Sequence, residues 1–185
     1  MLSPEYPIVT PRLLLRPFAP ADVAGVHAFE SLPEVHRYLY SEPRDLAAVE
    51  ELVARRAAGT ALREPDDYLS LVVELKETGA VIGHVLLHWV SAEHRQGEVG
   101  YVFSPAYAGQ GYATEAAEPM LRLGFDGLGL HRIVGRLDGR NTPSARLLER
   151  LGMRREAHLV QNEFVKGEWT DEVVYAMLAS EWAAR

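Results

Sequence analysis

Residues 98–116, EVGYVFSPAYAGQGYATEA, decide the fold more than any other stretch of this chain. They begin with a run of β-branched and aromatic residues, typical of a strand, that contains one acidic residue, Glu98. Pro105 follows the run, and a loop with two glycines, Gly109 and Gly111, leads directly into a helical pattern. The stretch therefore predicts a strand, a loop with an accessible backbone and a helix N-terminus in direct succession.

The loop and the helix start together predict an anion site. The first N–H groups of a helix have no intrahelical partner, and the positive end of the helix dipole points the same way. Glycines let the backbone approach a phosphate closely. A dinucleotide fingerprint would need a third glycine where this chain has Thr114, and the Gly-Lys-Ser/Thr of a Walker loop does not occur. We therefore expect a phosphate or pyrophosphate here, and both departures oppose a nucleotide-phosphate binder.

The same stretch resembles the acetyl-CoA loop of the GNAT N-acetyltransferase superfamily, usually written Q/R-x-x-G-x-G/A. Gly109 and Gly111 match the pattern, whereas Ala106 stands where Gln or Arg is usual. The wider string, E-V-G-Y-x-x-x-P and then G-x-G-Y-A-T-E-A, is similar to the branch that acetylates the N-termini of ribosomal proteins. That branch often lacks the Gln or Arg. The opening run 10–17 and the closing run 166–178 extend the resemblance over nearly the whole chain.

A second block, 141–153, resembles the superfamily helix N-x-x-S-x-x-L-x-x-x-x-G-F/M, in which the Asn approaches the cofactor. Helix rules agree, because Asn141 or Thr142 suits an N-cap, Pro143 suits the first turn and Gly152 suits a C-terminal cap. Many members place a Tyr four residues beyond the Ser, where this chain has Leu148. Ser144 is then the candidate proton donor, as proposed for the resembling branch. A water molecule in that role, and a Ser that merely bonds backbone, remain open.

The resemblance implies an acyl-CoA N-acyltransferase-like fold of the α/β (α+β mixed) class. It has three layers, with a central, twisted, mixed but mostly antiparallel sheet of about seven strands flanked by helices. The sequence patterns agree with strands interleaved with helices, and no linker divides residues 1–185, so we expect a single domain. The expected strands are 12–18, 68–75, 81–90, 98–103, 131–137, 155–165 and 170–178, and the expected helices are 20–31, 32–38, 45–61, 114–125 and 144–151.

The resemblance also implies acetyl-CoA as cosubstrate. Its pyrophosphate is expected on the amides of the glycine loop and its pantetheine amides beside the preceding strand. That strand rises about 20 Å between residues 98 and 104 at ~3.3 Å per residue, comparable to an extended pantetheine arm. The expected cofactor-binding residues are Val102, Phe103, Gly109, Gln110, Gly111, Tyr112, Ala113, Thr114, Asn141 and Ser144.

Glu98 is the candidate general base. In a strand it shares one face with Gly100 and Val102, so a lone carboxylate points where the face is otherwise small or apolar. Burial would raise its pKa toward that of a useful base, acting through a water molecule. The alternative is a solvated glutamate at a strand edge. The chain has no cysteine, so it cannot form a cysteine thioester, and direct attack in a ternary complex is expected.

The acceptor amine is the open question. The branch resemblance points first to a protein N-terminal amine, but the same scaffold serves polyamines, amino acids and aminoglycoside-like amines. A noncatalytic acyl-CoA-binding or regulatory module is a further alternative. We expect specificity in the stretches 32–44 and 160–170, with Tyr38 and Tyr40 as walls of the acceptor pocket.

The composition of the chain restricts the classes of molecule that it can bind. Of 185 residues, 48% are hydrophobic, which excludes global disorder, and the net charge of −7 opposes nucleic-acid binding and favours cationic partners. No apolar run approaches a membrane span of ~20 residues, no signal peptide is recognised, and the absence of cysteine fits the cytoplasm. A monomer or homodimer without metal is expected. His84 and His88 would lie about 13 Å apart along a strand, too far to share an ion.

Overall fold

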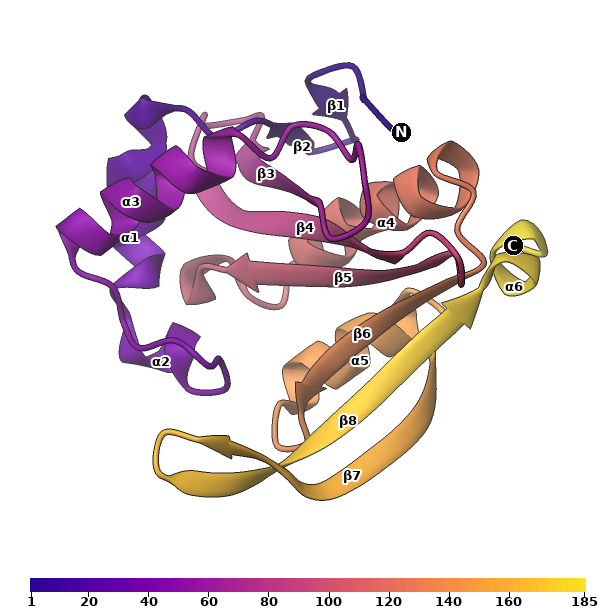
Figure 1. The fold of residues 1–185 in the computed structure, drawn as a ribbon. Helices are drawn as coiled ribbons and strands as arrows, with labels where there is room; N and C mark the ends of the chain where they lie inside the picture. The colour runs from indigo at the N-terminus through magenta and orange to yellow at the C-terminus, as the bar shows by residue number, and fades with distance from the viewer.

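One sheet organises the chain, and the computed structural model describes all residues from 1 to 185 (Figure 1). The sheet has eight strands in the order β1-β2-β3-β4-β5-β6-β8-β7. Every neighbouring pair is antiparallel except β5 and β6, which are parallel. The strands are β1 (Ile8–Val9), β2 (Leu13–Arg16), β3 (Tyr68–Leu75), β4 (Val81–Ser91), β5 (Gln96–Phe103), β6 (Arg132–Asp138), β7 (Arg154–Val165) and β8 (Glu168–Leu178).

Helices cover both faces of this sheet, because alternate strand residues send apolar side chains to opposite sides. On one face, Leu71 and Val85 belong to a core that includes residues of α4 and α5. On the other face, Val72 packs with Phe29 of α1 and Leu52 of α3. The helices are α1 (Val23–Glu30), α2 (Pro33–His36), α3 (Leu46–Ala57), α4 (Tyr112–Arg122), α5 (Thr142–Arg150) and α6 (Ala179–Ala183). The three-layer mixed fold predicted from the sequence is thus confirmed.

The helix ends follow the sequence rules. Asp45 caps α3 by accepting a hydrogen bond from the amide of Ala48 at 2.8 Å. Asn141 caps α5 in the same way, with the amide of Ser144 at 3.2 Å. Gly152 has a φ of 80°, the left-handed conformation expected just beyond a helix C-terminus. The start of α5, and with it Ser144, is therefore fixed by local sequence.

Most elements begin or end a few residues from the expected positions; α3, for example, ends at Ala57 and not at residue 61. Three differences bear on the site. The sheet has eight strands and not about seven, because the two-residue strand β1 pairs with β2 and is too short to show a pattern. The helix α2 ends at His36 and not at residue 38, because the chain beyond it turns away and is held by side-chain contacts described below. The helix α4 begins at Tyr112, since Gly111 is its left-handed N-cap.

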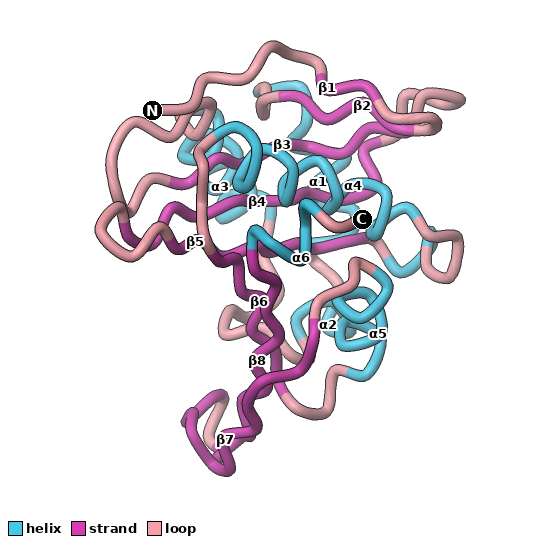
Figure 2. Tube along the Cα trace, turned by 90° about the vertical axis from the view of Figure 1, so that its right-hand side faces the viewer, coloured by secondary structure: helices cyan, strands magenta, loops and turns pink.

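The pairing between β5 and β6 is short, and this positions the site. It covers only residues 96–98 on β5 and 132–134 on β6, after which β5 keeps its partner β4 and β6 keeps its partner β8. Figure 1 shows the two strands diverging from this point, and Figure 2 shows β6, β8 and β7 extending away from β1–β5. The sheet is thus split into two parts.

None of the helices combines the length and the hydrophobicity that a membrane span requires.

Candidate active site

The split sheet leaves one side of β5 without a strand partner between residue 99 and its end at Phe103. Buried backbone N–H and C=O groups are normally paired, so an unpaired stretch inside a sheet is a place for a ligand with amide groups. Val102 and Phe103, expected beside a pantetheine arm, lie in this stretch. Their other side pairs with His84 and Gly83 of β4.

The glycine loop lies directly beyond β5. Gly109 and Gly111 have φ values of 76° and 80°, which favour glycine. The backbone amides of residues 109–114, which include Gln110, Tyr112, Ala113 and Thr114, have no backbone acceptor. The first amide that donates a hydrogen bond at the start of α4 is that of Glu115. Free amides at the start of an eleven-residue helix are an arrangement suited to binding an anion.

Arg12 adds a positive charge beside the loop, and sequence reasoning missed it. Its guanidinium donates to the carbonyl oxygen of Gln110 at 2.9 Å and lies 4.3 Å from the ring centre of Tyr112. Glu115 holds it in place through a hydrogen bond of 2.7 Å from Nε. More than a hundred residues separate Arg12 from Glu115, so no local pattern revealed the pair.

Glu98 lines a cavity of about 150 Å³. Tyr38 and Tyr40 line this cavity, as predicted, together with β6 and the hairpin formed by β7 and β8. Both stretches expected to determine specificity, 32–44 and 160–170, therefore contribute to one pocket. Its lining includes six carboxylates, Glu98, Asp138, Glu163, Glu168, Asp171 and Glu172, and four basic side chains, Arg37, Arg136, Arg140 and Lys166.

Burial raises the pKa of Glu98, and neighbouring charges limit the rise. The side chain is 32% exposed, and Nε of Arg136 lies 3.5 Å from its carboxylate. Arg136 and His88, the cross-strand neighbour of Glu98, both lower the pKa, whereas the negative charge of Glu172 raises it slightly. Arg136 is itself held by Glu172 at 3.0 Å. The result is a carboxylate more basic than usual, which suits a general base.

Ser144 lies on the opposite side of β5 from Glu98. Its hydroxyl is 2.8 Å from the hydroxyl of Tyr101, which also contacts the Ser144 carbonyl oxygen at 3.3 Å. Tyr101 is three residues beyond Glu98, so its side chain takes the other face, where it packs against the core that includes α4. Burial raises the pKa of Tyr101 to about 12, so it stays protonated at neutral pH. Sequence reasoning missed Tyr101, although strand alternation already placed it there.

The remaining candidates have ordinary roles. Asn141 is used as the cap of α5, which leaves it beside Ser144. His84 and His88 lie on β4, and each has its own neighbours: His84 bonds to Glu30, and His88 stacks on Tyr68 with ring centres 4.0 Å apart. No group of three potential metal ligands is present.

Comparison with known proteins places this geometry in a family. The model of the acetyltransferase (GNAT) domain matches residues 12–154. The uncharacterized N-acetyltransferase YnaD of Bacillus subtilis is 34% identical over 95% of this chain and 98% of its own. An acetyltransferase structure of the GNAT family from Bacillus anthracis superposes with a TM-score of 0.85 at 33% identity, covering 94% of this chain and 99% of that one.

Two further relatives bear on the acceptor. The spermidine N-acetyltransferase of Vibrio cholerae, solved in complex with CoA and spermine, has a TM-score of 0.77 at 26% identity, covering 94% of this chain and 99% of that one. YdaF of Bacillus subtilis, provisionally named a ribosomal N-acetyltransferase, is 28% identical over 65% of this chain and 66% of its own.

This chain belongs to the GNAT acetyltransferase family. The predicted superfamily, the N-acetyltransferase class and acetyl-CoA as cosubstrate are thereby confirmed.

The glycine loop gives a direct test. We expect Gly111→Val to weaken CoA binding about tenfold or more, because a side chain at this left-handed position strains the loop and blocks close approach of a phosphate. Gly79→Val is the matched control: Gly79 has a similar φ of 71°, open space around it and a place in the β3–β4 turn, outside the glycine loop. Isothermal titration calorimetry with CoA measures both. Equal affinities in the two folded variants would exclude the loop from the CoA site.

Proposed function

We propose that this protein transfers acetyl from acetyl-CoA to a primary amine in a ternary complex, with Glu98 as general base and Ser144 as proton donor. Acetyl-CoA, the cosubstrate, supplies the activated acetyl group. Its pyrophosphate is assigned to the amides of residues 109–114 and to Arg12, and its pantetheine arm to the unpaired side of β5. The unpartnered amides and the open strand edge support this assignment.

One observation carries the mechanism: the base and the donor lie on opposite faces of the same strand, at the point where β5 and β6 part. Glu98 faces the cavity from which an amine arrives, and takes the amine proton through a water molecule as the C–N bond forms. Ser144 faces the other side, where it gives its proton to the sulfur as the C–S bond breaks. Tyr101, whose hydroxyl is protonated at neutral pH, holds the Ser144 hydroxyl; it passes its proton to the Ser144 alkoxide and takes up a proton from solvent in return.

Removing the base should separate chemistry from binding. Glu98→Gln keeps the size of the side chain and is expected to lower kcat roughly 100-fold or more with CoA affinity unchanged. The loss should be greatest at low pH, where free amine is scarcest. Steady-state kinetics between pH 6 and 9, with CoA affinity from calorimetry, measure this. Near-native turnover of the variant across that range would remove Glu98 from the mechanism.

The acceptor we favour is a small cationic amine. The pocket at Glu98 has an excess of carboxylates over basic side chains, and Glu163 lines it without an ion-pair partner. A polyamine or similar compound presents the complementary charge. The relatives named as spermidine acetyltransferases, which align over nearly the whole chain, support this choice.

A protein N-terminal amine is the second candidate, and a different observation favours it. Tyr40 lines the pocket and is 69% exposed. Phe164 and Trp169, at 62% and 60%, pack against each other in the adjoining hairpin with ring centres 5.3 Å apart and planes tilted by 58°. Exposed aromatic side chains beside a pocket suit the contacts that a peptide makes after its first residue. The partial match to YdaF agrees with this candidate.

One screen distinguishes these acceptors. Free-thiol release from acetyl-CoA is followed over panels of polyamines, aminoglycosides, amino acids and N-terminal peptides, and the products are identified by mass spectrometry. We expect turnover on polycationic small amines. Turnover on peptides alone would overturn that choice in favour of the N-terminal amine. If no panel gives thiol release although CoA binds tightly, the protein is a noncatalytic acyl-CoA-binding module.

A further inference from the structure

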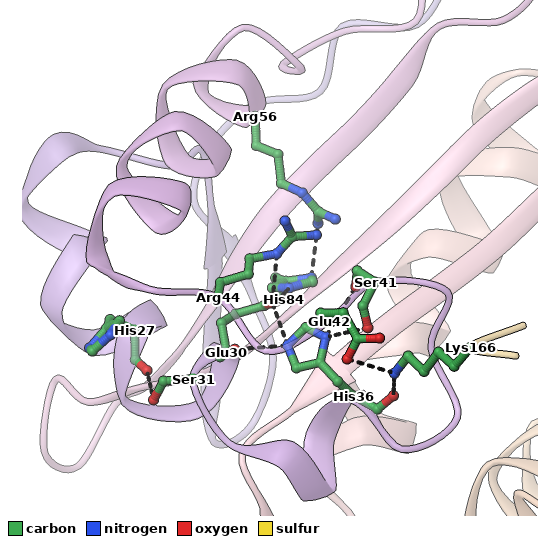
Figure 3. A network of polar contacts seen from close by, with 10 residues as sticks. All are labelled: His27, Glu30, Ser31, His36, Ser41, Glu42, Arg44, Arg56, His84 and Lys166. Carbon is green, nitrogen blue, oxygen red and sulfur yellow. Dashed lines mark hydrogen bonds and ion pairs between the residues drawn. The ribbon is translucent and has the colours of Figure 1, made fainter.

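One wall of the pocket has no regular structure of its own. The helix α2 ends at His36 and α3 begins at Leu46, and the chain between them carries Tyr38 and Tyr40. We call residues 37–44 the acceptor wall. Such a segment keeps a defined position only if other groups satisfy its backbone and fix its side chains. A set of buried polar side chains beneath it does this (Figure 3).

Glu30, the last residue of α1, is the centre of that set and is only 3% exposed. Its carboxylate lies 2.7 Å from Nε2 of His84, 3.1 Å from Nε of Arg44 and 3.2 Å from Nε2 of His36. Its carbonyl oxygen accepts from the backbone amide of Arg44 at 2.9 Å and from the His36 ring at 2.8 Å. One residue thereby holds both ends of the acceptor wall.

The protonation states of the side chains in this set agree with the hydrogen bonds that they make. Arg56 donates to Nδ1 of His84 at 2.9 Å, and Nε2 of His84 then donates to Glu30. Burial and the charge of Arg56 lower the pKa of His84 to about 4, so its ring is neutral at pH 7. Burial alone would raise the pKa of Glu30, but the hydrogen bond from His84 and the nearby positive charges lower it, so the carboxylate is ionised.

His36 links the set to the middle of the wall. Its Nε2 donates to Glu30, and its Nδ1 lies 3.1 Å from both the carbonyl oxygen and the hydroxyl of Ser41. The ring is fully buried. The wall is therefore held at three points, at His36, at Ser41 and at Arg44.

A second contact closes the wall against the opposite side of the pocket. Lys166 lies in the two-residue turn between β7 and β8, where it and Gly167 have φ values of 53° and 84°. Its ammonium group donates to the carbonyl oxygen of His36 at 2.5 Å and lies 3.8 Å from the carboxylate of Glu42. Lys166 thus joins the hairpin to His36 and Glu42, as Figure 3 shows.

A buried carboxylate adds little net stability to a core, because the free energy lost when the charge leaves water offsets its attraction to its partners. Apolar residues of equal volume often stabilise a core as well or better. What a paired and fully hydrogen-bonded charge does provide is a single defined arrangement of its partners. Here those partners are the residues that carry Tyr38 and Tyr40 to the cavity beside Glu98.

We propose that Glu30 is a positioning residue for the acceptor: with His36, His84 and Arg44 it fixes the acceptor wall, and Lys166 joins that wall to the hairpin. Glu30, His36, His84 and Arg44 lie outside the lining of the pocket, and Lys166 is part of that lining. The inference rests on the proposed function, because it assigns the cavity at Glu98 to the amine. The network therefore governs acceptor binding, while acetyl-CoA binds on the other side of β5 independently of it.

The test compares two buried carboxylates at opposite ends of one helical region. Glu30→Gln keeps the volume and removes the charge. Asp22→Asn is the matched control, because Asp22 is 4% exposed and bonds Arg16 through two contacts of 2.8 Å, but bonds no residue of the acceptor wall. Lys166→Met, at a partly exposed turn, opens the outer contact without disturbing the core.

The readouts are the KM for the best amine of the screen, the KM for acetyl-CoA, and hydrogen exchange of residues 37–44. We expect Glu30→Gln to raise the amine KM roughly tenfold or more and to speed exchange in the wall, with the acetyl-CoA KM within about twofold. Lys166→Met should do the same to a smaller extent, and Asp22→Asn should change none of the three.

Three results would overturn the proposal: unchanged exchange of the wall in folded Glu30→Gln, equal rises in both KM values, or the same changes in Asp22→Asn. If Glu30→Gln fails to fold, an unchanged amine KM and unchanged exchange in Lys166→Met overturn it. Exchange is measured without any acceptor. An enzyme that acetylates no amine in the screen thus refutes the proposed function and still reveals whether Glu30 fixes the wall.

Discussion

The structure depends on the early end of the pairing between β5 and β6. Parallel strands are usually paired along their length and covered on both faces, but here only residues 96–98 and 132–134 pair. The two parts of the sheet are each supported independently, β5 by β4 and β6 by β8. Helix α5 packs so closely on β6 that a side chain at Gly135 would lie 2.9 Å from Leu148. The opening is therefore built into the fold, and it leaves Glu98 at its start, the glycine loop beyond the far end of β5 and the Tyr101–Ser144 pair beside it.

Two of the three buried carboxylates, Glu30 and Glu172, lie next to pocket elements, and the third, Asp22, pairs with Arg16 away from the pocket. The large core beneath α4 and α5 is a cluster of hydrophobic residues. Glu172 holds Arg136, which faces Glu98, and Glu30 holds the acceptor wall. Buried ion pairs contribute little net stability, but removing one partner is costly, so such pairs restrict their neighbours to one arrangement. The apolar core thus supplies stability, and the polar groups supply the geometry of the site.

The parts of the structure that follow from neighbouring residues were predictable from the sequence. Strand β3 has the predicted bounds, Asn141 caps α5, and the glycine loop precedes a helix. Contacts between distant segments were not predictable, because alternation gives the face of a strand but not what covers that face. Arg136 bonds Glu172, 36 positions away, and Lys166 contacts His36 across 130 positions. The early end of α2 has the same origin, since distant side chains hold the segment that follows it.

The central claim is that the thioester occupies the opening between β5 and β6, with the base on one side and the proton donor on the other. A crystal structure of the CoA complex tests this most directly. The account predicts pyrophosphate oxygens on the amides of residues 109–114, pantetheine amides bonded to the backbone of β5, and the sulfur within reach of the Ser144 hydroxyl on one side and open to the Glu98 pocket on the other. A sulfur bound away from this opening, or a pantetheine arm lying in the pocket between the acceptor wall and the hairpin, would contradict it.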